Sequence, residues 1–232
     1  MSDRQKIIRI SPLGDCALLV EFTAVFNREL NQHIHALAWQ IKNQIQIGIT
    51  DLVPSYHSLA VFYQPESIRF SELQQIILQC NAHTVPSADQ RRHIDIPVCY
   101  EHEYAPDLMH LAEHCQLSIE EVIQRHSQTH YDVYFLGFKP GFAYLGGLDS
   151  SLQMPRKATP RLQVPAGSVG IGGEQTGIYP QITPGGWQII GRTPLTLFDP
   201  TQVSPCLLQP GDSVRFVPIT SQEFLRMVTQ TC

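Results

Sequence analysis

Glycine is distributed very unevenly along this chain, and that distribution constrains the fold more than any other feature. The sequence has 15 glycines, of which only Gly14 and Gly48 precede residue 135. From Tyr131 onward, short β-prone runs are interrupted every few residues by glycine or proline, as in FLGFKPGFAYLGGLD. Glycine lets a strand bend sharply or lets another segment approach it closely. The C-terminal region is therefore predicted to be a β-barrel whose corners are turned by glycine.

The region before residue 84 has a different pattern, typical of an α+β domain. The apolar runs KIIRI and CALLVEF are split by turn residues and predict a hairpin. A helical stripe over residues 27–46 consists of Leu30, Ile34, Leu37, Ile41 and Ile45. Two strands, ITDLV and SLAVFY, and a helix with Ser71 and Gln74 as its capping box complete the order ββαββα. We therefore expect an antiparallel sheet with helices on one face.

The segment VPSADQRRH is typical of a linker, and a second region follows it. That region opens with the strand HIDIPVCY and two short helices, the later one with Ser118 and Glu121 as a capping box. The strands YDVYFLGF, LQVPAGSVGI, WQIIG, LTLFD and SVRFVPI come next, and Thr220 and Glu223 cap a last helix packed on the outside. We predict a small α+β domain over residues 1–84 and a β-barrel domain over residues 85–232.

Composition excludes several classes of partner. The formal charge of −5 comes without a basic stripe, so nucleic acid is not an expected partner. The start of the chain lacks the apolar core of a signal peptide, and no run approaches the roughly 18 apolar residues that span a bilayer. The six cysteines form no C-x-x-C pair, which favours reduced thiols. The sequence therefore predicts a cytoplasmic protein with no membrane contact.

Two short motifs suggest chemistry without establishing it. HLAEH, from His110 to His114, matches the H-x-x-E-H pattern of zinc peptidases, but no distant Glu ligand is evident and a solvated helix face explains it better. AGSVGIGGEQTG, from Ala166 to Gly177, could surround an anion with backbone N–H groups or could simply turn a barrel corner. We expect no metal and no prosthetic group.

A third constellation is more informative because cations are few in this chain. Arg156, Lys157, Arg161 and Arg192 lie between turn residues, and the same loops offer Gln175, Thr176, Tyr179, Trp187 and Thr193. Guanidinium forks in such loops favour a carboxylate or phosphate ligand, although they could instead bind loop carbonyls. The residues alone predict a site for a small anionic molecule.

Taken together, these motifs carry a resemblance to a known family. GFKPGFAYLGGLD, PRKATPRLQVPAGSVGI, GEQTGIYPQITPGGW, IIGRTPLTLFD and PGDSVRF, in this order, resemble the allophanate hydrolase subunit 1 family. Its members are also described as 5-oxoprolinase B subunits and as sporulation-type kinase inhibitors. The resemblance covers nearly the whole chain and implies an α+β domain followed by a cyclophilin-like β-barrel, in which Phe138, Phe142, Tyr144 and Trp187 fill the core or line a groove that faces a partner.

The resemblance implies work in a complex. With A and C subunits, such a protein would open 5-oxoproline to L-glutamate with ATP as a cosubstrate, whose site can be shared across a subunit interface. Arg156, Arg161, Arg192 and Thr193 would bind phosphate or the substrate carboxylate, while Gln175, Thr176 and Tyr179 orient the lactam. His126 matches a family position and is a candidate acid or base, or else a structural group.

Two other functions fit the same family. One is the carboxyltransferase half of a urea carboxylase or allophanate-type system. The other is an inhibitor module that binds a sensor histidine kinase through exposed aromatic side chains. Arginine substitutions should abolish turnover and spare kinase binding, and aromatic substitutions should do the reverse.

Overall fold

The computed structural model describes residues 7–22, 27–44, 48–83 and 91–231. Contacts between residues divide the chain into two compact units, residues 1–90 and 91–232. The boundary expected after residue 84, most of the linker and Ile45 lie outside the described residues. Each unit has a hydrophobic core of its own.

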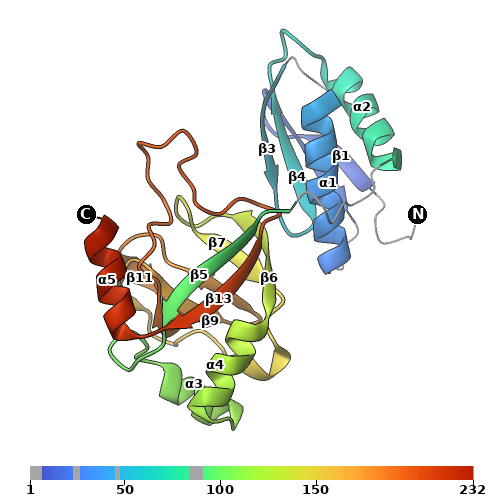
Figure 1. Cartoon of the computed structure of the whole chain (residues 1–232). Coiled ribbons are helices and arrows are strands. Elements are labelled where there is room, and N and C mark those ends of the chain that lie inside the picture. Colours follow the sequence, from blue (N-terminus) through green and yellow to red (C-terminus); the bar gives the residue numbers. More distant parts are fainter. Residues whose placement is uncertain (1–6, 23–26, 45–47, 84–90, 232) are drawn as a thin grey trace. The chain divides into compact units, whose positions relative to one another are not determined.

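The first unit has the predicted order ββαββα. The elements are β1 Ile7–Pro12, β2 Ala17–Phe22, α1 Arg28–Gln44, β3 Ile49–Pro54, β4 Ser58–Tyr63 and α2 Phe70–His83. Their strands form an antiparallel sheet in the order β1-β2-β4-β3. Figure 1 shows α1 and α2 side by side over one face of this sheet. The predicted fold of this region is confirmed.

The core of this unit is built from helix residues that recur every three or four positions and from strand residues that recur every second position. The fully buried side chains of the stripe on α1 are Leu30, Ile34, Leu37 and Ile41. They pack in one cluster with alternate residues of β2: Leu18, Val20 and Phe22.

One local prediction in this unit is wrong, because α2 begins earlier than expected. The Leu73 N–H donates to the Arg69 carbonyl at 3.0 Å. Ser71 therefore lies inside the first turn and does not have the position of an N-cap.

The second unit is built around a closed barrel with strand order β10-β7-β6-β13-β5-β12-β9, as expected for a cyclophilin-like domain (Figure 1). Its elements are β5 His93–Cys99, α3 Leu108–Cys115, α4 Ile119–Gln128, β6 His130–Leu136, β7 Ala143–Gly146, η3 Ser150–Leu152, β8 Arg161–Val164, β9 Ser168–Gly172, β10 Gln175–Ile178, β11 Thr183–Gly185, β12 Gln188–Arg192, β13 Ser213–Ile219 and α5 Ser221–Thr231. Strands β8 and β11 form a separate two-stranded sheet.

Strands β5 and β13 close the barrel as a parallel pair, whereas the other ladders are antiparallel. Residues 93–99 pair one by one with residues 213–219. An ion pair between Arg215 and Asp95 lies along this seam, and another between Arg92 and Asp212 lies at its start. The barrel therefore depends on contacts between segments that are far apart in the sequence.

Helix ends in this unit largely follow the predicted capping boxes. The Glu121 N–H donates to Ser118 Oγ at 3.1 Å, and the Ser118 N–H donates to the Glu121 carboxylate at 2.8 Å. Thr220 and Glu223 make the same reciprocal pair at the start of α5. Phe224 of α5 is buried on the outside of the barrel, 4.5 Å from Tyr104 between ring centroids. Both capping predictions are confirmed.

The predicted strand LTLFD, residues 195–199, does not form. Prolines bound it at positions 194 and 200, and an isolated bridge joins Phe198 to Cys206. The Leu207 N–H donates to the Leu197 carbonyl at 3.0 Å. The run therefore pairs with a neighbouring loop instead of a barrel strand.

The glycine-rich segment 166–177 forms a hairpin of β9 and β10, and its glycines make room for rings. A Cβ on Gly172 would lie 2.5 Å from Trp187 Nε1. A Cβ on Gly146 in β7 would overlap the ring of Tyr134. Close approach of aromatic side chains thus accounts for the glycines at these two positions.

In the part of the chain that the structure covers, no helix has both the length and the apolar character required to span a bilayer.

Candidate functional site

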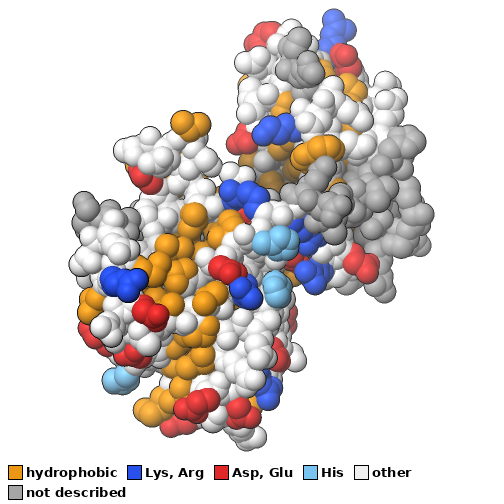
Figure 2. All heavy atoms as spheres, viewed as in Figure 1, with side chains coloured by type: hydrophobic (Ala, Val, Ile, Leu, Met, Phe, Trp, Pro, Cys, Tyr) orange, Lys and Arg blue, Asp and Glu red, His pale blue; other side chains and the backbone are white. Residues whose placement is uncertain are grey.

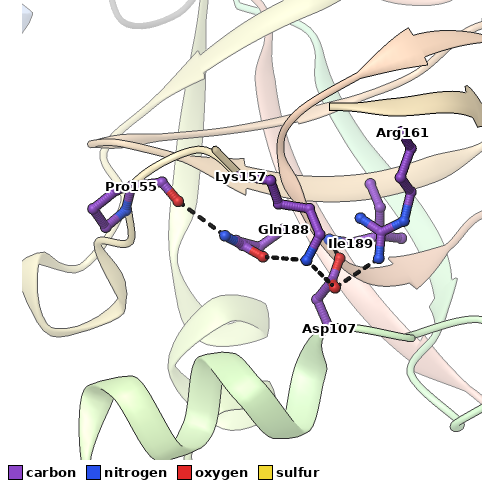
Figure 3. A network of polar contacts seen from close by, with 6 residues as sticks. All are labelled: Asp107, Pro155, Lys157, Arg161, Gln188 and Ile189. Atoms are coloured by element: carbon purple, nitrogen blue, oxygen red, sulfur yellow. Dashed lines mark hydrogen bonds and ion pairs between the residues drawn. The ribbon is translucent and has the colours of Figure 1, made fainter. Parts of the chain in front are cut away.

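Asp107, at the start of α3, holds two cations and a strand in place (Figure 3). Its Oδ1 accepts a hydrogen bond from Lys157 Nζ at 2.8 Å and one from Arg161 Nη2 at 2.7 Å. Its Oδ2 accepts the Ile189 N–H at 2.7 Å, and its own N–H donates to the Ile189 carbonyl at 2.9 Å. One buried carboxylate thus fixes the segment before β8 against the start of β12.

Gln188 connects the same segment to β12 at a second point. Its Oε1 accepts from Lys157 Nζ at 3.3 Å, and its Nε2 donates to the Pro155 carbonyl at 2.9 Å (Figure 3). The Lys157 N–H donates to the Gly186 carbonyl at 2.7 Å. The loop that carries Arg156 and Lys157 is therefore anchored through both backbone and side chains.

Asp107 is charged in this setting. Burial alone would raise its pKa, but the hydrogen bonds from Arg161, Lys157 and the Ile189 N–H hold the pKa of this carboxyl below its ordinary value. One carboxylate faces two cations, with Arg156 nearby, so the cluster keeps a net positive charge. Such a cluster attracts anions.

Arg161 has a donor that is not used within the described part of the chain. Its Nη1 is buried and has no hydrogen-bond partner there. Leaving a buried donor unsatisfied costs roughly 1–3 kcal/mol, more for a charged group. An acceptor supplied by a ligand would remove that cost.

An aromatic cluster adjoins the cations and is formed by Phe142, Tyr144, Tyr179 and Trp187. The rings meet edge to face, with centroid distances of 5.5 Å from Phe142 to Trp187 and 5.4 Å from Phe142 to Tyr179. The guanidinium of Arg156 lies 5.7 Å from the centroid of the Trp187 ring. Burial raises the pKa of Tyr179, although a backbone hydrogen bond from Trp187 and the charge of Arg156 act to lower it. Arg156 thus connects the aromatic cluster to the loop that carries Lys157.

Most of this cluster is core. Phe142 is 2% exposed and Trp187 is 4% exposed, so neither ring is available to face a partner in this structure. Phe138 differs from them, because its side chain is 56% exposed and its φ of +65° lies in the left-handed region. A side chain larger than glycine is uncommon there, and such strain is found most often at functional positions.

A hollow of about 430 Å³ opens beside the Asp107 cluster. It is lined by His110 and His114 of α3, by residues 154–159 and by Gln188. No acidic residue is among these lining side chains within the described ranges. The hollow thus brings the HLAEH motif next to Arg156 and Lys157.

His126 and Thr176 lie away from this cluster, inside the barrel. His126 is fully buried, with Nδ1 2.8 Å from Tyr100 Oη and Nε2 2.9 Å from Thr176 Oγ1, and its ring stacks on Phe216 at 4.4 Å. Burial lowers the pKa of His126 to about 3. Thr176 Oγ1 donates to the Gly170 carbonyl at 3.1 Å. Both side chains are thus fully engaged in the core.

Arg192 and Thr193 lie at the far end of β12. Arg192 Nε donates to the Ala166 carbonyl at 2.8 Å, and its guanidinium lies 5.9 Å from the centroid of the Phe224 ring. Thr193 is buried, and its Oγ1 accepts from the Leu195 N–H at 3.3 Å. These residues hold loops together, and neither contributes to the hydrogen bonds of Asp107, whose partners are Lys157, Arg161 and Ile189. Gln175 lies half-buried at the start of β10.

Sequence reasoning missed Asp107 and Gln188. The only local signal is that Asp107 precedes an apolar helical run, which indicates an N-cap. Asp107 does occupy the N-cap of α3, but its side chain makes no capping hydrogen bond and turns toward Lys157 and Arg161 instead.

The surface of the barrel unit also has an apolar feature. Figure 2 shows hydrophobic side chains gathered in a band over the face on which Figure 1 draws β5 and β13. Contiguous apolar patches of this kind are typical of faces that meet another protein.

Comparison with known proteins places this geometry in a family. Residues 8–208 match the family model described as carboxyltransferase domain, subdomain C and D. The chain is 43% identical over 227 residues to the 5-oxoprolinase B subunit of Bacillus subtilis, covering 93% of this chain and 95% of that one. It is 43% identical over 207 residues to the 5-oxoprolinase B subunit of Escherichia coli O157:H7, covering 89% and 94% of the two chains.

Solved structures agree with the fold. The crystal structure of TTHA0988 matches with a TM-score of 0.77 and 35% identity over 88% of this chain, which spans 40% of the length of that protein. The urea carboxylase of Kluyveromyces lactis matches with a TM-score of 0.68 at 20% identity over 97% of this chain and 24% of that one, a likeness of fold alone. The chain therefore belongs to the family of 5-oxoprolinase B subunits, whose fold is that of carboxyltransferase subdomains C and D.

Proposed function

We propose that this chain is the B subunit of an ATP-dependent 5-oxoprolinase, which opens 5-oxoproline to L-glutamate together with partner subunits of the A and C types. The single observation that carries the proposal is the similarity to B subunits of this name over nearly the full length of both chains. The cytoplasmic location expected from the sequence stays a prediction.

The reaction has requirements that the Asp107 cluster meets. ATP phosphorylates the amide oxygen, which makes the ring carbon reactive toward water, and the lactam C–N bond then breaks. Because the original oxygen leaves as phosphate, water supplies both oxygens of the new carboxylate. Negative charge develops at each step and needs cations held in position beforehand. Asp107 holds Lys157 and Arg161 in fixed positions, and it does so without neutralising the cluster.

Within this reaction we assign Arg161 to the substrate carboxylate. Its buried Nη1 lacks an acceptor among the described residues, and a planar carboxylate is the acceptor that a guanidinium fork fits best. Tyr179 lies in the adjoining aromatic cluster and would border the lactam ring. Four further residues position the barrel wall and its loops, because their contacts lie there: His126, Thr176, Arg192 and Thr193. Gln175 receives no role.

The test is reconstitution. This chain is co-expressed with candidate A and C subunits, and 5-oxoproline-dependent ATP hydrolysis and glutamate release are measured with each subunit omitted in turn. We expect turnover to vanish without this chain. Arg161→Gln should raise the KM for 5-oxoproline by roughly tenfold or more, because a charge-assisted hydrogen bond is lost. Arg9→Gln, in the exposed ion pair with Glu21, is the matched control and should leave turnover unchanged.

Turnover that persists when this chain is left out of an assembled complex would refute the proposal. Activity on urea-type substrates alone would favour the carboxyltransferase alternative. The kinase-inhibitor alternative predicts binding to a sensor histidine kinase that survives Arg161→Gln and is lost in Phe138→Ser, because Phe138 is the exposed ring of the predicted aromatic set.

A further inference from the structure

The hollow beside Asp107 has two walls with different donors. His110 and His114 are one turn apart on α3 and both are exposed, while Leu111 and Ala112 of the same helix are buried. Residues 154–159 and Gln188 line the rest of the hollow. The HLAEH pattern thus arises because one side of α3 packs on the barrel and the other side faces the hollow.

Donors on both walls are available. No hydrogen bond within the described residues uses His110, His114 or the guanidinium of Arg156, which is held over Trp187. Lys157 Nζ makes two contacts, to Asp107 and Gln188, and an ammonium has three N–H donors. Each imidazole has at least one N–H donor in either protonation state. The hollow can therefore donate several hydrogen bonds from two separate segments of the chain.

The charges around the hollow select an anion over a metal ion. Two histidines could coordinate zinc, but no group of three or more metal-ligating side chains is found in the described ranges. Arg156 and Lys157 line the same hollow as the histidines and would repel a divalent cation. The carboxylate of Asp107, beside this wall, is already bonded to Lys157 and Arg161.

The arrangement of donors further selects among anions. A carboxylate is planar and presents two oxygens, so one guanidinium fork can saturate it. A phosphoryl group is tetrahedral and presents three oxygens in different directions, so donors from two separate segments can reach it together. A lysine and an arginine are the side chains that proteins use most often for phosphate.

We propose that the hollow is a phosphoryl-binding site in which His110 and His114 from α3 and Arg156 and Lys157 from the loop of residues 154–159 hold the phosphate oxygens. The site rests on the proposed function, because the ATP-dependent reaction releases phosphate. The family resemblance already implies that Arg156 binds phosphate or a carboxylate, and the parts of His110, His114 and Lys157 are new. The phosphoryl group could be free phosphate or the terminal phosphate of a nucleotide.

The test is a binding measurement on the full chain without partner subunits. Inorganic phosphate is titrated by isothermal calorimetry into the wild type and into the double variant His110→Asn/His114→Asn, with acetate as a carboxylate probe. We expect saturable phosphate binding that the double variant weakens by roughly tenfold or more, since charge-assisted hydrogen bonds are lost. His102→Asn is the matched control, an exposed histidine outside the hollow, and should bind phosphate like the wild type.

In a second experiment, ATP is titrated into the protein in the presence of phosphate. Competition between the two would identify the nucleotide's terminal phosphate as an occupant, and its absence would leave free phosphate. Equal phosphate affinity in the wild type and the double variant, or acetate binding as tight as phosphate binding, would overturn the proposal. Because no turnover is measured, a failure here is distinct from a failure of the 5-oxoprolinase proposal, which the reconstitution tests separately.

Discussion

At Asp107 one carboxylate accepts hydrogen bonds from a lysine, an arginine and a backbone N–H while its side chain is only 5% exposed. Such a group couples the stability of the fold to the geometry of the site, because Lys157 and Arg161 are aligned by the carboxylate that also anchors β12. A loss of the charge on Asp107 should therefore change both the stability of the fold and the geometry of the site.

We predict a pH-dependent stability difference between the wild type and Asp107→Asn. The folded-state pKa of Asp107 is lowered, so its stabilising contribution is fully present above the unfolded value of about 3.9 and is lost as pH falls through the folded value. The variant should lose roughly 1.5–3 kcal/mol of unfolding free energy at about pH 6, and the gap should shrink below about pH 4. Urea unfolding followed by Trp187 fluorescence, in a Trp39→Phe background, measures it.

The control for this measurement is Asp95→Asn, whose carboxylate is 58% exposed in its pair with Arg215. It should show a much smaller gap at every pH. A gap for Asp107→Asn that stays constant from about pH 3.5 to about pH 7 would contradict the assigned charge state.

His126 gives a second prediction for a single residue. Here too the unfolding free energy should fall as pH drops, but over a different pH range. Burial lowers its pKa to about 3, whereas an unfolded histidine titrates near 6.5. The unfolded state binds more protons between these values, so the unfolding free energy should fall as pH drops below about 6.5, approaching roughly 1.4 kcal/mol per pH unit. His126→Gln should remove that slope. A ring NMR signal that titrates between about pH 5 and about pH 8 would show instead that His126 can exchange protons as a catalytic group.

At the scale of elements, the strands of the barrel are shaped by the rings that lie against them. β9 reaches Trp187 so closely that its Gly172 has no room for a Cβ. The same tryptophan also supports Arg156, so strand packing and the cation cluster share one ring.

We predict that Gly172→Ala destabilises the barrel unit by about 1–3 kcal/mol, because the added methyl group must displace Trp187 or the backbone. Gly186→Ala is the control, since its Cβ would meet its nearest neighbours at 3.6 Å, an ordinary contact distance. Urea unfolding with Trp187 fluorescence compares the two variants. Equal midpoints would mean that β9 can shift at little cost.

The elements also show which features a sequence can reveal. The helix stripe on α1 and the caps of α4 and α5 were predictable, because residues three or four apart determine them. The role of Asp107 was not predictable, because its partners Lys157, Arg161 and Ile189 lie 50, 54 and 82 residues away in the sequence. The arginines were predicted as one site, and in the fold they have different partners: Arg161 donates to Asp107, whereas Arg192 donates to the Ala166 carbonyl.

At the scale of the whole chain, the two units have separate hydrophobic cores, one around Leu18 and Leu37 and one around Tyr131 and Ile171. Units with their own cores can unfold independently. We predict two urea transitions, read by pulsed hydrogen exchange of peptides from residues 48–83 and from residues 130–190, with the barrel unit showing the steeper dependence on urea. A single shared midpoint for both sets of peptides would indicate one cooperative unit.

The parallel seam of β5 and β13 has a consequence for how the chain is made. Arg92 and Asp212 at its start are 120 residues apart, so synthesis at about 5–20 residues per second separates the two strands by roughly 6–24 s. During that interval β5 presents an open edge, which is a template for pairing with other nascent chains. The barrel can close only late in translation, and the cell must keep its first strand from aggregating until its last strand has left the ribosome.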